Sequence, residues 1–309
     1  MREVMKPGIF FAAVLLVTVF LFGAVSCTDS DDQKYIDREQ RLLEQYLIDN
    51  NIDEEPTESG LYYIEMEEGD GVSPAMGNYL IIEYRVRLIT GKIVETTYEQ
   101  EAKDNDLYNP DIVYGPYKFR IDNTPLEGVK EGLLMMKEGG RARLIIPSHL
   151  AYGSSSVGEI PKYSTLIFDI KLHTVIDDPE RHERQLITQY VEDNNIVEDP
   201  TDFDIYYIEI EEGTGDHPDI HMNVLVHYTG WFIDGRMYNT TKDTQPFEFV
   251  LGEHAATPGF EAGIKMMKPG GKAKLIVPSW RGYGPDGTAD GRIPPWMTII
   301  YEVELLELY

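Results

Sequence analysis

The stretch LMMKEGGRARLIIPS, residues 134–148, returns nearly unchanged as KMMKPGGKAKLIVPS, residues 265–279, at an offset of 131. Upstream, NNI at Asn50 and YYIE at Tyr62 return at Asn194 and Tyr206, each at an offset of 144. The difference between the offsets, 13 residues, is an insertion in the first copy. Solenoid repeats have periods of roughly 20 to 50 residues, far shorter than this. The chain of 309 residues therefore contains a duplicated domain.

Each copy has the sequence pattern of an antiparallel sheet. Apolar and polar residues alternate in residues 80–88, 166–172, 224–228 and 299–305. One buried face and one solvated face are typical of antiparallel strands. A single short helix is predicted inside each copy, over residues 126–136 and 259–267, and the glycines of KEGG and KPGG mark its end. The prediction is an α+β lobe with four or five strands around one helix.

A short amphipathic helix is predicted ahead of each copy, in DREQRLLEQYLIDNNI and PERHERQLITQYVEDNNI. Its apolar stripe consists of Leu42, Leu43, Tyr46 and Leu47 in the first copy and Leu186, Ile187, Tyr190 and Val191 in the second. Such a stripe can pack on its own lobe or pair with another molecule. Packing on the lobe and a homodimer through these lead helices both remain open.

The N-terminus predicts an export signal. Arg2 and Lys6 precede the apolar run from Ile9 to Val25. Cys27, the only cysteine, follows FGAVS in a pattern that resembles the lipobox of bacterial lipoproteins, with Ala24 where leucine is usual. We therefore predict a signal peptide over residues 1–26 and lipid on Cys27, which would anchor the protein to a membrane. A cleaved secreted form and an uncut transmembrane anchor are the alternatives.

The acidic character of the chain limits its partners. Asp29, Asp31 and Asp32 resemble the surface-export signal of Bacteroides-group lipoproteins, which implies the bacterial outer membrane, on its periplasmic or surface side. The net charge is −27 and no basic patch stands out, so nucleic acid is not an expected partner. No metal or cofactor is expected either, because Pro218 separates His217 from His221 and disfavours a helical metal pair.

Several motifs of the second copy occur in a family-specific order. They are VHYTGWFIDGRMYNTT, PFEFVLG, PGFEAGIKMMKPGGKAKLIVP, GYG and IPPWMTIIYEVELLEL. The first copy holds IIEYRV, PYKF, EGLLMMKEGGRARLIIP, AYG and STLIFDIKL. Both copies resemble the FKBP-type peptidyl-prolyl isomerases, and the first is more diverged. The resemblance implies a half-barrel sheet wrapped around the helix, with an aromatic pocket that binds a proline ring.

The repeat and the resemblance together predict the domain boundaries. They are a signal peptide over residues 1–26, an acidic linker over 27–34, a lead helix over 35–56, a first FKBP-like domain over 57–176, a linker and second lead helix over 177–202, and a second FKBP-like domain over 203–309.

The resemblance also implies the pocket residues. In the second lobe they are Tyr228, Tyr238, Phe247, Phe260, Tyr283, Ile293 and Tyr301. In the first lobe the weaker, substrate-binding set is Tyr84, Tyr117, Leu126, Val129, Tyr152, Ile160 and Phe168, with Val94 beside them. Phe260 replaces the usual tryptophan and Asn239 an aspartate, while Val94 and Val129 replace aromatic rings. The insertion YEQEAKDNDLYNPDIVYG is expected to be a solvated loop, with Tyr98, Tyr108 and Tyr114 as candidate contacts for partners.

The implied activity is proline isomerisation in unfolded or partly folded exported proteins, mainly in the second lobe. An X-Pro bond rotates over a barrier of about 18–20 kcal/mol, and its two isomers differ by only about 1 kcal/mol. A dry pocket that favours the twisted amide can therefore catalyse without a nucleophile, metal or base. A non-catalytic chaperone or peptide-binding lipoprotein is the alternative.

Overall fold

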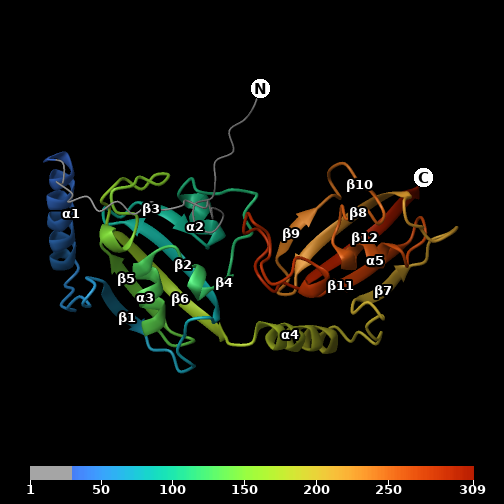
Figure 1. Ribbon diagram of the computed structural model, residues 1–309, viewed down its shortest axis with the longest axis horizontal. Helices are drawn as coiled ribbons and strands as arrows, with labels where there is room; N and C mark the ends of the chain where they lie inside the picture. Colours follow the sequence, from blue (N-terminus) through green and yellow to red (C-terminus); the bar gives the residue numbers. More distant parts are fainter. Residues whose placement is uncertain (1–29) are drawn as a thin grey trace, which may run out of the picture. The chain divides into compact units, whose positions relative to one another are not determined.

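The computed structural model describes residues 30–309, which form two compact units divided after Asp177 (Figure 1). The predicted signal peptide and Cys27 lie outside the described residues. The first unit contains α1 (Ser30–Asp49), β1 (Tyr62–Glu67), β2 (Tyr79–Leu88), β3 (Ile93–Thr96), α2 (Glu99–Asp104), β4 (Tyr117–Arg120), η1 (Ile121–Asn123), α3 (Glu127–Met135), β5 (Arg141–Ile146), η2 (Ser148–Leu150) and β6 (Leu166–Ile176). The second contains α4 (Pro179–Asp193), β7 (Tyr206–Glu211), β8 (Asn223–Phe232), β9 (Met237–Thr240), β10 (Phe247–Val250), α5 (Pro258–Ile264), β11 (Lys272–Val277), η3 (Ser279–Arg281) and β12 (Ile299–Leu308).

Each unit is built on a six-stranded antiparallel sheet, and the α+β prediction is confirmed. The order is β1-β5-β6-β2-β3 in the first lobe and β7-β11-β12-β8-β10 in the second. The predicted count of four or five strands is wrong, because one long strand pairs with two short ones. Thus β2 pairs with β4 along its first half and with β3 along its second, and β8 likewise pairs with β10 and β9.

The internal helix of each lobe lies directly against the sheet. A side chain at Gly132 of α3 would meet Leu144 of β5 at 2.4 Å, and one at Gly263 of α5 would meet Leu275 of β11 at 2.3 Å. A Cβ atom at either position would force the leucine side chain to shift, so glycine permits this close packing of helix and strand. Helices α3 and α5 therefore pack on β5 and β11.

The lead helices pack on the lobes that follow them. Helix α1 begins at Ser30 and so includes residues that the sequence analysis placed in an acidic linker. The Asp32 carboxylate accepts a hydrogen bond from Lys162 at 2.9 Å, which ties this end of the helix to its lobe. Helix α4 begins at Pro179, and the Asp178 carboxylate caps it by accepting from the amide of Arg181 at 2.9 Å. Within residues 30–309, no helix is long and apolar enough to cross a membrane.

The insertion of the first lobe is not a plain solvated loop, as the sequence analysis expected. It contains α2, and Glu101 of that helix pairs with Arg85 of the sheet at 3.1 Å and accepts from Thr96 at 2.5 Å. Tyr108 and Tyr114 stack on each other with ring centroids 5.6 Å apart. The insertion is therefore held to its own lobe by polar contacts and an internal aromatic pair.

Candidate functional site

The second lobe gathers aromatic rings from four strands and one helix between the sheet and α5. Tyr228 of β8 is central, with ring centroids 5.6 Å from Phe260, 5.9 Å from Tyr301 and 6.1 Å from Phe247. All three pairs meet edge to face, an arrangement that aromatic rings prefer. Phe260 and Tyr301 lie closer still, at 4.8 Å. The sequence-predicted rings therefore form one continuous aromatic surface.

The hydroxyl groups of this cluster have defined partners. Tyr238 of β9 donates to the Tyr301 hydroxyl at 3.0 Å, and the Asn239 amide donates to the Tyr228 hydroxyl at 2.7 Å. Burial raises the pKa of Tyr238 and of Tyr301 well above the ordinary tyrosine value. Both phenols therefore stay neutral at physiological pH and present hydrogen-bonding groups without charge.

Tyr283 and Ile293 reach the site from the loop between η3 and β12. The Arg292 guanidinium donates to the carbonyl oxygen of Tyr238 at 2.9 Å, which ties this loop to β9. Ile293 is 3% exposed and Tyr283 is partly exposed. The Tyr283 hydroxyl lies near the hydroxyls of Tyr228 and Tyr301. After burial, this neighbour is among the causes that raise the pKa of Tyr228 and of Tyr301. Tyr283 is thus a partly exposed member of the cluster and supplies a hydroxyl at its rim.

Two aromatic residues of this site are absent from the sequence prediction. Phe249 stacks on Phe247 at 5.0 Å and lies 6.2 Å from Phe260, while Phe232 stacks on Tyr238 at 5.6 Å. The alternation in FEFV puts Phe249 on the same face as Phe247, so that period-two signal could have identified it. Both rings pack against rings of the predicted pocket.

The first lobe brings its predicted residues into one buried apolar cluster, but with a different surface. Tyr84 and Phe168 lie 6.3 Å apart, and Tyr117 and Tyr152 pack at the margin. The buried aliphatic members are Val94, Leu126, Val129 and Ile160. Val94 and Val129 occupy the positions of Tyr238 and Phe260. The first pocket is therefore lined more by aliphatic side chains than by rings.

Paired changes between the lobes explain how each pocket stays packed. A side chain at Gly230 would meet the Tyr238 ring at 2.4 Å, so glycine makes room for that tyrosine. The first lobe has Val86 in place of Gly230 and Val94 in place of Tyr238. Phe168 likewise replaces Tyr301, so both partners of the 3.0 Å hydroxyl pair are absent together. These paired substitutions avoid both a steric clash and an unpaired buried hydroxyl, while they change the chemistry of the pocket.

Glu95 is a pocket residue that the sequence analysis missed. It holds the position of Asn239, and the Tyr84 hydroxyl donates to its carboxylate at 2.6 Å. Burial raises the pKa of Glu95 to about 8, opposed only by the hydrogen bond from Tyr84. The Glu95 charge also contributes to the raised pKa of Tyr117 and of Tyr152, so both lie near it. An acidic residue in the short strand IVET carries no signal of burial among three tyrosines, because side-chain exposure depends on the packed sheet.

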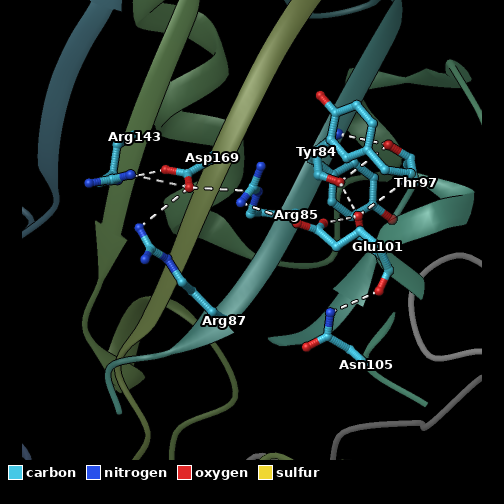
Figure 2. A network of polar contacts seen from close by, with 10 residues as sticks. Tyr84, Arg85, Arg87, Thr97, Glu101, Asn105, Arg143 and Asp169 are labelled. Carbon is cyan, nitrogen blue, oxygen red and sulfur yellow. Dashed lines mark hydrogen bonds and ion pairs between the residues drawn. The ribbon is translucent and has the colours of Figure 1, made fainter. Parts of the chain in front are cut away.

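The opposite face of the first sheet carries the polar network of Figure 2. Asp169 of β6 accepts from Arg143 of β5 at 2.6 Å and from Arg87 of β2 at 3.4 Å, with Arg85 4.0 Å away. These contacts cross three neighbouring strands and fix their register. Tyr84 directly precedes Arg85 on β2, and Phe168 directly precedes Asp169 on β6. The network therefore also fixes where the two rings enter the pocket. Figure 2 shows the hydrogen bond between Tyr84 and Thr97 beside it.

Neither pocket contains a set of metal ligands. Across the described part of the chain, no group of three or more His, Cys, Asp or Glu side chains could hold a metal ion.

Known proteins are similar to both lobes. The model of the FKBP-type peptidyl-prolyl cis-trans isomerase family matches residues 71–173 and 215–306. The peptidyl-prolyl cis-trans isomerase FKBP9 of Mus musculus is 28% identical over 233 residues, which cover 75% of this chain and 35% of that protein. The FK506-binding protein of Neisseria meningitidis serogroup B is 42% identical over 102 residues, 33% of this chain and 93% of that protein.

Among solved structures, FkpA from Escherichia coli is 29% identical with a TM-score of 0.36, and the match covers 42% of this chain and 62% of that chain. The chain spans about a third of the length of the FKBP9 protein of Mus musculus. The two segments matched by the family model cover more than half of the chain, one in each lobe. The chain belongs to the FKBP-type peptidyl-prolyl cis-trans isomerase family, with two tandem domains.

Proposed function

We propose that this protein is a peptidyl-prolyl cis-trans isomerase that acts on proline-containing unfolded or partly folded polypeptides, chiefly through its second lobe. The observation that carries the proposal is the ring cluster around Tyr228, with Tyr283 at its rim. Family membership supports the same activity.

The geometry accounts for catalysis without a reactive group. A twisted X-Pro amide has less charge separation than a planar one, so an apolar surface disfavours the planar ground state relative to the transition state. Rings that already contact one another do not need to reorganise when the proline enters. A neutral hydroxyl such as that of Tyr283 would hold the carbonyl oxygen before the proline. Each 1.36 kcal/mol of differential stabilisation raises the rate about tenfold.

The second lobe is proposed to be the more active because it keeps rings at both differing positions. Val94 and Val129 shrink the aromatic surface of the first lobe, and Glu95 adds a carboxyl group to it. A loss of about 2–3 kcal/mol in differential stabilisation would slow catalysis roughly 30- to 150-fold. The first lobe would then serve mainly to bind polypeptide.

The test uses matched substitutions in the full chain. Tyr283→Phe and Phe260→Val alter the second pocket, while Tyr152→Phe and Val129→Ala alter the first. Proline isomerisation of a tetrapeptide is measured as kcat/KM by a protease-coupled assay. We expect the second-lobe variants to lose most activity and the first-lobe variants to lose little. Equal losses, or a larger loss from the first-lobe variants, would contradict the assignment.

Peptide binding without catalysis is the second candidate, and the diverged first pocket favours it there. A variant with Tyr283→Phe and Phe260→Ala that still suppresses aggregation of a proline-free client would show a holding activity separate from isomerisation. Loss of both activities together would favour isomerisation as the basis of folding assistance.

The place of action is proposed to be the bacterial cell envelope, at the outer membrane, through lipid on Cys27. The sequence around that cysteine supports this. Metabolic labelling with palmitate tests it, since Cys27→Ser should abolish the label and an undiminished label would exclude lipidation at this site. A homodimer through the lead helices stays a prediction: Glu39 and Glu183 tie the helices to their own lobes, but the apolar stripe of α1 is only partly buried.

A further inference from the structure

A buried glutamate joins the second lead helix to its lobe. Glu183 of α4 is 1% exposed. Its carboxylate accepts from the Ser279 amide at 2.7 Å, from the Ser279 hydroxyl at 2.6 Å and from the Thr298 hydroxyl at 2.5 Å. All three donors belong to the same lobe. Such a charge is buried only where several hydrogen bonds replace its water.

The first lobe repeats this arrangement through Glu39 of α1. Its carboxylate accepts from the Ser148 amide and hydroxyl, both at 2.6 Å, and from the Thr165 hydroxyl at 2.8 Å. Glu39 and Glu183 are separated by 144 residues, the offset of the upstream repeat. The two lobes have thus kept the glutamate, serine and threonine although their pockets have diverged.

The three donors stand at the two ends of one segment. Ser279 begins η3 and Thr298 immediately precedes β12, so they bracket residues 280–297. That segment carries Tyr283 and Ile293 of the pocket, and in the first lobe the bracketed residues 149–164 carry Tyr152 and Ile160. One carboxylate therefore holds both ends of the segment that supplies the rim hydroxyl.

We propose that Glu183 and Glu39 are positioning residues, which clamp the ends of this segment and so place Tyr283 or Tyr152 over the proline pocket. The proposal rests on the isomerase function inferred above and extends it to the lead helices. Attachment of the helix alone would need only one contact to the lobe, whereas the observed donors come from both ends of a single segment. The lead helix thereby becomes part of the support of the site.

A second feature shows why such a support is needed. The segment 280–297 has no long strand or helix of its own after η3. Its internal hydrogen bonds include the Trp296 amide to the Gly284 carbonyl at 3.1 Å and the Thr288 amide to the Ile293 carbonyl at 2.9 Å, and the Arg292 guanidinium ties it to the Tyr238 carbonyl of β9 at 2.9 Å. Release of its ends would leave the rim hydroxyl held by loop hydrogen bonds of this kind, with no strand or helix pairing to support it.

The test uses the full chain and measures the segment directly. Glu183→Gln removes the charge and replaces one acceptor oxygen by an NH2 group, which can only donate. Glu192→Gln makes the same change at an exposed position of the same helix. Amide hydrogen exchange of residues 280–297 should accelerate about tenfold in Glu183→Gln, with exchange in β8 and β12 unchanged. Its kcat/KM should fall about fivefold or more well below the melting temperature. Glu39→Gln should accelerate exchange in residues 149–164 only.

Thr298→Val is the second variant, in case Glu183→Gln folds poorly. It frees one end of the segment, leaves the Ser279 contacts in place, and should give a smaller acceleration in the same peptides. If Glu183→Gln lowers the melting temperature but exchange in residues 280–297 rises no more than in β8 and β12, the glutamate only attaches the helix and the proposal is wrong.

Failure of the clamp and failure of the isomerase proposal give different results. If the wild-type chain shows no isomerase activity, the proposed function fails, and the clamp is judged by exchange and by affinity for a proline-containing peptide. Faster exchange with unchanged affinity and activity would overturn the positioning role.

Discussion

Glu95→Gln should remove a pH dependence of stability from the first lobe. Burial raises the pKa of Glu95 from 4.5 to about 8, so between these values the folded chain keeps a proton that the unfolded chain releases. The free energy of unfolding then falls as the pH rises, with a slope of about 1.4 kcal/mol per pH unit for one proton. Glutamine is neutral throughout and does not contribute this slope.

The size of the effect follows from the pKa difference and the exposure of the side chain. A difference of 8 minus 4.5, or 3.5 units, corresponds to about 5 kcal/mol if it is fully expressed. Glu95 is half-buried, so water screens part of its charge, and we expect about 2–3 kcal/mol. The two proteins should be nearly equal in stability at pH 4.5. At pH 8.5 Glu95→Gln should be the more stable by this amount.

The two lobes can be followed separately in the intact chain. Trp231, Trp280 and Trp296, the three tryptophans, all belong to the second lobe, so their fluorescence in urea reports that lobe. Amide exchange in β2 and β6 reports the first lobe, compared between wild type and variant at each pH. Glu99→Gln, an exposed change in the same lobe, is the control. Identical pH dependence in wild type and Glu95→Gln would refute the inference that the folded chain holds this proton.

Three further predictions concern packing. Gly230→Ala should push the Tyr238 ring aside, lower the free energy of unfolding by about 1–3 kcal/mol and reduce kcat/KM. Gly230→Val combined with Tyr238→Val should restore stability, measured by tryptophan fluorescence, without restoring activity. Tyr301→Phe should lower the free energy of unfolding by about 1 kcal/mol, because it removes the hydroxyl 3.0 Å from that of Tyr238. Adding Tyr238→Phe should recover part of that loss in the same assay, and fully additive losses would contradict the pairing. Asp169→Ala should destabilise the first lobe by about 2 kcal/mol or more, because Arg143 and Arg87 lose their carboxylate partner. Amide exchange should be faster in β5 and β6 but not in β8, and an unchanged rate would show that the network does not stabilise the lobe.

The two lobes show how a duplicated pocket can change without losing its fold. Valine at both Val86 and Val94 replaces the Gly230 and Tyr238 combination, so the space released by one change is filled by the other. The clamp of glutamate, serine and threonine is the same in both lobes. At these positions the pocket has diverged while the attachment of the lead helix has been kept.

The sequence by itself determined the duplication, the antiparallel sheets and most pocket positions. These features depend on local signals: the repeat offsets, the period-two alternation and the glycines after each helix. The predicted pocket residues of each lobe do come together in its structure. Their role in catalysis stays a prediction, as does lipid on Cys27.

Only the tertiary structure decided how distant side chains complete each lobe. Glu183 and Ser279 are 96 residues apart, and Glu39 and Thr165 are 126 apart, so no local pattern connects them. Glu95 looks like any strand carboxylate until the sheet surrounds it with Tyr84, Tyr117 and Tyr152. The sixth strand likewise appears only when two short segments pair with one long strand. In each case the cause is burial, because hydrogen-bond partners and pKa depend on which surfaces the fold removes from water.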